Sequence, residues 1–334
     1  MDNRRIVLAS RPQGAATLEN FRLETVPAPE AADGELLLRT RWLSLDPYMR
    51  GRMSDGPSYA SPVAIGQPMV GGTVAEVVAS RAPGFAAGDL VASGNGWQDY
   101  AVAPASAVTR LDPGLAQPSS ALGVLGMPGF TGYHGLLKIG EPKPGETVVV
   151  GAATGAVGSV VGQIARLKGA RAVGVAGGPE KCRHAVEVLG FDACVDHRAE
   201  DFPAQLAAAC PSGIDVYFEN VGGAVMAAVA PLLNDGARIP VCGVIATYNT
   251  DSPASSLSAD ILLRTILVHR ARVQGFLIGD HFGQMEDFRR DMKGWLERGE
   301  IRYVEHRVKG LENAPAAFLG LLKGENLGKA VVEV

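Results

Sequence analysis

The sequence predicts an α/β protein that combines a β-rich domain with a doubly wound parallel sheet. Residues 1 to about 120 contain short β-rich runs separated by Pro and Gly, which is typical of a compact barrel or sandwich. From Glu146 onward, strand-like and helix-like patterns alternate, as they do in a parallel sheet with helices on both faces. A chain of 334 residues is long enough for two domains. We expect the β-rich domain to comprise residues 1–121 and 300–334, and the parallel-sheet domain residues 122–299.

The individual elements follow from the same patterns. Residues 147–150 are uninterruptedly apolar, as expected for a strand that is buried on both faces. Pro179 favours a helix start, because its fixed backbone angle suits the first turn. In the second domain, strands are expected at residues 147–150, 171–175, 193–195, 214–218, 237–242 and 272–277, and helices at residues 157–168, 180–189, 202–209, 224–233 and 285–298. Further strands are expected at residues 72–78, 90–91, 100–104, 301–307 and 329–334, and a last helix at residues 312–323.

Composition and charge exclude several classes of function. The 31 basic and 35 acidic residues give a formal net charge of −4, which provides no general attraction to nucleic acid or anionic membranes. The apolar run near the N-terminus is too short for a signal peptide, and no stretch of about 18 uninterrupted apolar residues occurs. The four cysteines lie far apart and form no CxxC pair. We expect a cytoplasmic protein with a small-molecule substrate.

A glycine-rich turn follows the first expected strand of the parallel sheet. Ala153, Gly155 and Gly158 form a GxGxxG pattern with Ala in the first position. Glycine suits this place because a Cβ would keep the backbone away from a pyrophosphate, and a helix that begins here offers free N–H groups. The pattern alone is equally consistent with an ordinary tight turn. The preceding strand and the following helix favour a dinucleotide site.

The end of the second expected strand indicates which dinucleotide is bound. An NAD site usually carries Asp or Glu there, whereas residues 176–178 are Ala-Gly-Gly. Lys181 follows closely, and a basic residue favours the 2′-phosphate of NADP(H). Glu180 argues for NAD, but it follows Pro179 at a helix start, where an acid complements the helix dipole. Lys181 is also consistent with a solvated helix residue.

Several catalytic motifs are absent from the sequence. No Tyr-x-x-x-Lys, HExxH or GxSxG pattern occurs, and the six histidines are scattered without ligand-spaced partners. We therefore expect chemistry without a metal.

Five segments carry a family resemblance: residues 46–53, 126–133, 153–163, 219–223 and 322–329. They resemble the prostaglandin reductase, leukotriene B4 dehydrogenase and alkenal double-bond reductase family, within the zinc-independent medium-chain dehydrogenases/reductases. Residues 4–12, 177–185 and 237–243 are most similar to its bacterial curcumin reductase branch. Gln67 and Pro68 stand where the zinc enzymes of the superfamily have His and Glu. The resemblance implies a GroES-like β-rich domain, a Rossmann domain and NADPH as the cofactor.

The resemblance also implies roles for individual residues. His197 stands where eukaryotic members usually have Tyr beside the adenosine phosphate, and we expect tighter NADPH binding when it is protonated. The implied cofactor contacts are Gly155, Ala156, Val157 and Gly158 at the pyrophosphate, Lys181 and His197 at the adenosine phosphate, Asn220, Cys242, Gly243 and Tyr248 in the groove, Phe276, Leu277 and Ile278 at the nicotinamide, and Asn326 from the C-terminal segment.

The implied reaction is reduction of a carbon–carbon double bond conjugated to a ketone or aldehyde, with hydride delivered to the β-carbon and a proton added afterwards to the α-carbon. Negative charge then develops on the carbonyl oxygen, which needs a hydrogen-bond donor. Tyr248 is the candidate, acting directly or through the ribose hydroxyl, because a phenol with a reference pKa of about 10 stays protonated at neutral pH. A packing or lid role is the alternative. The candidate substrate-binding residues are Tyr48, Tyr59, Arg50 and Met127, for which turn or core packing is the competing interpretation.

Two other functions remain open at this point. One is quinone reduction, another reaction of zinc-free relatives, and the other is NADPH binding without useful turnover. The resemblance further implies a homodimer, for which residues 272–277 would supply the pairing edge.

Overall fold

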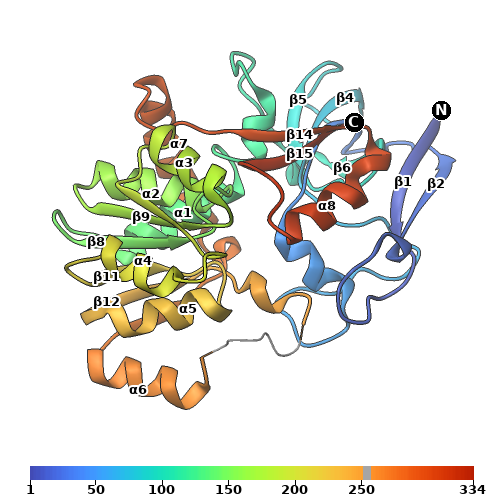
Figure 1. Cartoon of the computed structure of the whole chain (residues 1–334). Helices are drawn as coiled ribbons and strands as arrows, with labels where there is room; N and C mark the ends of the chain where they lie inside the picture. Colours follow the sequence, from blue (N-terminus) through green and yellow to red (C-terminus); the bar gives the residue numbers. More distant parts are fainter. Residues whose placement is uncertain (251–256) are drawn as a thin grey trace. The chain divides into compact units, whose positions relative to one another are not determined.

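The computed structural model describes residues 1–250 and 257–334, and the chain divides into two compact units. Unit 1 comprises Met1–Gly123 and Glu305–Val334, and unit 2 comprises Val124–Val304. The expected boundaries fall after residues 121 and 299, whereas the units divide after Gly123 and Val304. Figure 1 shows the strands and helices of both units.

Unit 2 is built on a parallel sheet, as the alternating pattern predicted. Among the described residues its six strands have the order β10-β9-β8-β11-β12-β13, and each neighbouring pair is parallel. Parallel neighbours need crossover connections, and helices supply most of them (Figure 1). The strands are β8 (Thr147–Gly151), β9 (Arg171–Ala176), β10 (Ala193–Asp196), β11 (Ile214–Phe218), β12 (Leu233–Val241) and β13 (Arg272–Gly275).

Helices cover both faces of this sheet (Figure 1). Val148 and Val150 belong to one apolar cluster and Val149 to another, because successive side chains of a strand point to opposite faces. The first cluster receives side chains from α1 (Met127–His134), α2 (Gly158–Leu167), α3 (Pro179–Glu187) and α7 (Met285–Glu297). The second receives them from α4 (Phe202–Ala209), α5 (Gly223–Val229) and α6 (Ala259–His269).

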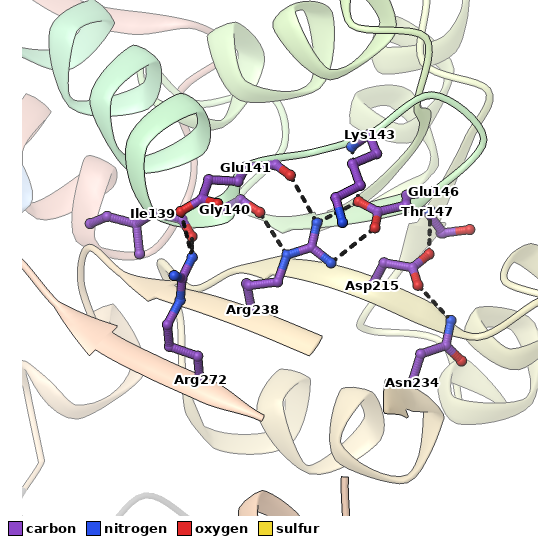
Figure 2. A network of polar contacts seen from close by, with 10 residues as sticks. All are labelled: Ile139, Gly140, Glu141, Lys143, Glu146, Thr147, Asp215, Asn234, Arg238 and Arg272. Atoms are coloured by element: carbon purple, nitrogen blue, oxygen red, sulfur yellow. Dashed lines mark hydrogen bonds and ion pairs between the residues drawn. The ribbon is translucent and has the colours of Figure 1, made fainter. Parts of the chain in front are cut away.

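Charged side chains tie together the edge of the sheet at which the strands begin (Figure 2). Arg238 of β12 donates to the carbonyls of Gly140 (2.9 Å) and Glu141 (3.0 Å) and forms an ion pair with Glu146. Arg272 of β13 reaches the Glu141 carboxylate at 2.9 Å. These contacts hold the π-helical turn Gly135–Gly140 against two strands. They lie at the opposite end of the strands from the expected cofactor site.

Unit 1 is β-rich, as predicted, and the C-terminal segment returns to it. Its larger sheet has the order β14-β15-β3-β4-β5-β7, with β6 paired to β3, and β1 pairs with β2 in a separate antiparallel ladder. Its strands are β1 (Asp2–Leu8), β2 (Phe21–Pro27), β3 (Glu35–Ser44), β4 (Thr73–Ser80), β5 (Leu90–Ser93), β6 (Tyr100–Pro104), β7 (Thr109–Arg110), β14 (Glu305–Lys309) and β15 (Lys329–Glu333), and its α-helix is α8 (Ala314–Leu322).

Several expected element boundaries differ from the structure, and three of these differences have a clear local cause. β13 stops at Gly275 rather than at residue 277, since Phe276 turns to contact the rings of His134 and Phe218. β14 begins at Glu305 rather than at residue 301, since Ile301 is buried in the core of unit 2. The helix expected at residues 224–233 gives way to β12 at Leu233, because Pro231 cannot continue it.

A buried ion pair fixes the end of β3 to the start of β15. Lys329 donates through Nζ to the Leu45 carbonyl at 2.7 Å and to the Asp46 carboxylate at 2.6 Å. The Ser44 hydroxyl donates to the other carboxylate oxygen of Asp46. Both ionic side chains are less than a tenth exposed, so each depends on the other for its charge to be compensated. Burial lowers the pKa of Lys329, and Asp46 opposes that shift.

We predict that Lys329→Met destabilises the protein by about 3–5 kcal/mol, because it leaves the Asp46 carboxylate buried without a counter-charge. Urea denaturation followed by tryptophan fluorescence measures the change. Adding Asp46→Leu to this variant removes the orphaned charge and should recover most of the loss. An unchanged denaturation midpoint for Lys329→Met alone would contradict the prediction.

Candidate functional site

The glycine-rich turn leaves β8 through a constrained loop. Ala152 adopts a positive φ of 53°, and its carbonyl accepts a hydrogen bond from the Gly155 amide at 2.9 Å. A Cβ on Gly158 would lie 2.3 Å from the same carbonyl oxygen, so only glycine fits there. α2 begins at Gly158 and directs its positive dipole end toward this turn. The turn therefore fits the pyrophosphate of a dinucleotide.

Three basic side chains gather beyond the ends of β9 and β10. Lys181 lies in the first turn of α3, while His197 and Arg198 directly follow β10. A Cβ on Gly177 would lie 3.0 Å from both His197 Nε2 and Arg198 Nε, which shows how closely these groups surround the end of β9. Partial burial and the Arg198 charge lower the pKa of Lys181 and of His197. A bound anion would relieve this mutual repulsion.

One carboxylate holds the backbone around this basic cluster of Lys181, His197 and Arg198. Asp196 Oδ1 accepts hydrogen bonds from the amides of Gly178 (2.8 Å) and Arg198 (2.9 Å). Burial opposes its ionisation, but these amides keep the pKa of Asp196 below its ordinary value. Because this carboxylate accepts hydrogen bonds from both amides, it fixes the conformation of the turns that carry Lys181, His197 and Arg198. The cluster fits a dianion such as the 2′-phosphate of NADPH.

Arg198 is a candidate site residue that the sequence reasoning did not single out. The sequence feature that could have identified it is its position directly after His197, at the end of the strand next to β9.

The lowered pKa of His197 affects the expected pH dependence of NADPH binding. The imidazole gains its proton only below the ordinary histidine range, so the expected gain in NADPH affinity would begin at that lower pH.

The ends of β8, β11 and β12 are linked at the same edge of the sheet. Asn220 follows β11, and its side-chain amide donates to the Gly151 carbonyl at 2.9 Å. The main-chain carbonyl of Asn220 accepts a hydrogen bond from the Ile245 amide at 3.2 Å.

Cys242 directly follows β12 in this region. Burial and the nearby Glu219 carboxyl raise the pKa of Cys242 to about 12, so this residue is present as a thiol.

Tyr248 stands at the end of the short helix Ile245–Thr247 and is half-buried. A Cβ on Gly243 would lie 3.1 Å from its hydroxyl oxygen, so the phenol points along the segment that follows β12. The structure thus brings together four predicted groove residues, which are Asn220, Cys242, Gly243 and Tyr248. Their contacts with a cofactor, and the catalytic role of Tyr248, stay predictions.

The predicted nicotinamide contacts follow the edge strand β13. Phe276 is half-buried against aromatic rings, whereas Leu277 remains 41% exposed. Ile278 begins the 3₁₀ helix Ile278–Gln284. This segment leaves the sheet at the same edge as Gly243, because β12 and β13 run parallel.

The remaining predicted residues are divided between the units. Met127 begins α1 in unit 2 and is 36% exposed, whereas Tyr48, Tyr59, Arg50 and Asn326 belong to unit 1. Arg50 is buried and donates to the Ser54 hydroxyl at 2.8 Å and to the Gly14 carbonyl at 2.7 Å. The Asn326 amide donates to the Gly328 carbonyl at 2.7 Å. Their contacts with substrate or cofactor also stay predictions.

The phenol of Tyr48 can donate a hydrogen bond in its neutral form. Burial, and to a lesser degree the Asp46 carboxylate, raise the pKa of its phenol, so it is protonated at neutral pH. Tyr59 is near enough to add to this shift, and it is 64% exposed. The structure therefore brings these two predicted substrate residues into one region of unit 1.

In residues 1–250 and 257–334, no three His, Cys, Asp or Glu side chains are grouped as they would need to be to hold a metal ion. In the same residues no helix combines the length and apolarity that crossing a bilayer requires.

Two family descriptions match most of the chain. The N-terminal domain of oxidoreductase matches residues 4–111, and zinc-binding dehydrogenase matches residues 156–297.

Individual relatives match over nearly the full length. NADPH-dependent curcumin reductase of Escherichia coli (strain K12) is 57% identical over 334 residues, which are 99% of this chain and 97% of the relative. Prostaglandin reductase 1 of Bos taurus is 40% identical and covers 96% of this chain and 95% of its own length. The crystal structure of CurA from Vibrio vulnificus in complex with NADPH has a TM-score of 0.96 at 56% identity and covers 99% of both chains.

Proposed function

The chain belongs to the family of medium-chain dehydrogenases/reductases that includes the prostaglandin and alkenal double-bond reductases, and from this membership we propose the reaction of its own site. The protein is an NADPH-dependent reductase of the carbon–carbon double bond in α,β-unsaturated ketones and aldehydes. The observation that carries this conclusion is the 57% identity with an NADPH-dependent curcumin reductase over 99% of the chain. The basic cluster beside Gly177 supports the choice of NADPH over NADH.

The chain's residues have separate tasks in this proposal. NADPH, when bound, supplies the hydride that reduces the double bond. The turn at Gly158 binds the pyrophosphate bridge of the cofactor, and the basic cluster binds its 2′-phosphate, so that together they orient it. Tyr248 donates a hydrogen bond to the substrate carbonyl oxygen, where negative charge develops. Tyr48, Tyr59, Arg50 and Met127 are proposed to line the substrate site.

The proposed activity is tested with the near-ultraviolet absorbance of NADPH and a panel of acceptors: an aliphatic enone, the aryl enone curcumin, a 2-alkenal and a quinone. We expect oxidation of NADPH with the enones and a product mass that corresponds to the saturated ketone. Quinone turnover with inactive enones would replace the proposal with quinone reduction. NADPH binding without oxidation by any acceptor would replace it with a binding function.

We predict that Lys181→Ala weakens NADPH binding about ten- to hundredfold, the scale of a charge-assisted hydrogen bond to phosphate. NADH lacks the 2′-phosphate, so its dissociation constant should not change. Titration of both cofactors by calorimetry gives the two constants. The matched control is Arg183→Ala, which removes an exposed base from the same helix. An equal loss for NADPH and NADH would contradict the role of Lys181.

We predict that Tyr248→Phe lowers kcat about a hundredfold, because one donor to a developing oxyanion is lost. The NADPH dissociation constant should stay near that of the parent. Steady-state kinetics with NADPH and with its C4-deuterated form show whether hydride transfer limits the rate. If hydride transfer is rate-limiting and kcat is unchanged, Tyr248 has only a packing role.

The proposed assembly is a homodimer that forms through the edge of the unit 2 sheet. β13 pairs with β12 on one side, and all four of its residues are exposed. α6 packs against β12 and presents large apolar side chains to solvent, among them Leu263 (64% exposed) and Leu267 (77% exposed). An open strand edge beside such a surface favours pairing with a second copy.

We also propose that the protein is located in the cytoplasm, where NADPH is available as a reductant.

We predict that the parent sediments as a dimer and that Leu267→Glu shifts it toward the monomer, because a carboxylate would be buried in the interface. Sedimentation velocity measures the change. Leu18→Glu in unit 1 is the matched control, since Leu18 is also 58% exposed and lies outside this surface. A monomeric parent, or an unchanged dimer in Leu267→Glu, would exclude this interface.

A further inference from the structure

Glu219 is a buried carboxyl group to which the proposed reaction gives no task. It follows β11 directly and is only 4% exposed. It stands next to Asn220, one of the predicted cofactor residues. Burying a carboxyl is costly unless its oxygens receive hydrogen bonds. Its contacts therefore indicate what it contributes to this edge of the sheet.

The side chain gathers three donors at a single oxygen. Glu219 Oε1 accepts hydrogen bonds from the backbone amides of Val221 (2.6 Å) and Gly222 (2.8 Å). It also accepts one from the Tyr217 hydroxyl at 2.9 Å. Two of the donors are amides of the turn that follows β11. The Glu219 carboxyl group therefore binds this turn to the end of β11. Burial raises the pKa of Glu219, and the amides and the phenol oppose that rise.

The main chain of the same residue reaches the neighbouring strand end. The Glu219 carbonyl accepts from the amides of Cys242 (2.9 Å) and Gly243 (3.2 Å). The Ala246 amide donates to the Val221 carbonyl at 2.9 Å, within the turn that the carboxyl holds. The conformation of residues 220–222 therefore sets the position of residues 242–246. Asn220 extends the connection to Gly151, where the glycine-rich turn begins.

We propose that Glu219 is a positioning residue that holds the turns after β11 and β12 in the conformation that binds NADPH. This inference rests on the proposed function only in taking NADPH as the ligand. Gly222 and Gly223 have positive φ values of 74° and 55°, and glycine in this region is free to adopt other conformations. The carboxyl removes this freedom before the cofactor arrives. Preorganisation of this kind strengthens binding because less ordering remains to be done on association.

The test compares Glu219→Met with the parent protein. Methionine keeps most of the side-chain volume but offers no oxygen to the two amides. We expect the dissociation constants of NADPH and of NADH to rise by about tenfold or more, and by a similar factor, because these turns lie away from the 2′-phosphate cluster. Hydrogen exchange of the peptide that contains Val221 and Gly222 should become faster in the cofactor-free protein.

Two further variants separate positioning from general stability. Glu219→Gln retains a side-chain oxygen that can accept from both amides, so its cofactor affinity should stay within about threefold of the parent. Tyr133→Phe removes a partly buried hydrogen bond of 2.7 Å to Asp291 elsewhere in unit 2. It should lower thermal stability without a change in cofactor affinity. If Glu219→Met does not fold, Glu219→Asp replaces it, because the shorter carboxylate cannot reach both amides.

The results separate this inference from the proposed function. Parent-like affinity for both cofactors in folded Glu219→Met or Glu219→Asp overturns the inference, even if the parent reduces enones. Unchanged hydrogen exchange at Val221 and Gly222 also overturns it. Weaker binding with faster exchange supports it, whichever acceptor the enzyme reduces. A parent that binds NADPH but reduces no enone would overturn the proposed reaction and leave the inference standing.

Discussion

The candidate site depends on one close approach between two backbone segments. Gly158 must pass the Ala152 carbonyl so closely that a Cβ would lie 2.3 Å from the oxygen. This approach lets α2 start directly above the end of β8 and pack against the sheet through Val160 and Ile164. Because the helix begins there, its first amides and its dipole face the space beyond the strand. The neighbouring turns after β9, β11 and β12 then surround a position that is already favourable for phosphate.

The two edges of the parallel sheet are stabilised by different means. Where the strands begin, Arg238 and Arg272 form ion pairs with glutamates and bond to main-chain carbonyls (Figure 2). Where the strands end, backbone amides and the side chains of Glu219 and Asn220 connect the turns. Lys181 and His197 at that edge have lowered pKa values, in part because of the nearby Arg198 charge. An anionic ligand bound there would offset the repulsion between Lys181 and Arg198.

The sequence predicted the parts of this arrangement that local chemistry determines. Three features can be recognised from residues that are close together in the sequence. They are the apolar run at residues 147–150, the glycines after it and the lack of an acid after β9. Arg198 was missed because its importance depends on β10 lying beside β9, which the linear order does not reveal. Glu219 was noticed only as part of a family motif, since its contacts with Val221 and Gly222 require the turn to be formed. Boundaries such as Gly275 were misplaced because the side chain of Phe276 has a packing partner outside the sheet.

The buried ion pair between Asp46 and Lys329 also affects the neighbouring Tyr48. Asp46 lies two residues after the end of β3. Its two carboxylate oxygens are engaged by the Lys329 ammonium and the Ser44 hydroxyl, so the charge serves to join β15 to the end of β3. The next side chains along the chain therefore start from a fixed anchor. Tyr48 stands two residues beyond it as a protonated phenol, because burial and the same carboxylate raise its pKa. A phenol that stays protonated can donate a hydrogen bond, and the proposed substrate-binding role of Tyr48 would use this property.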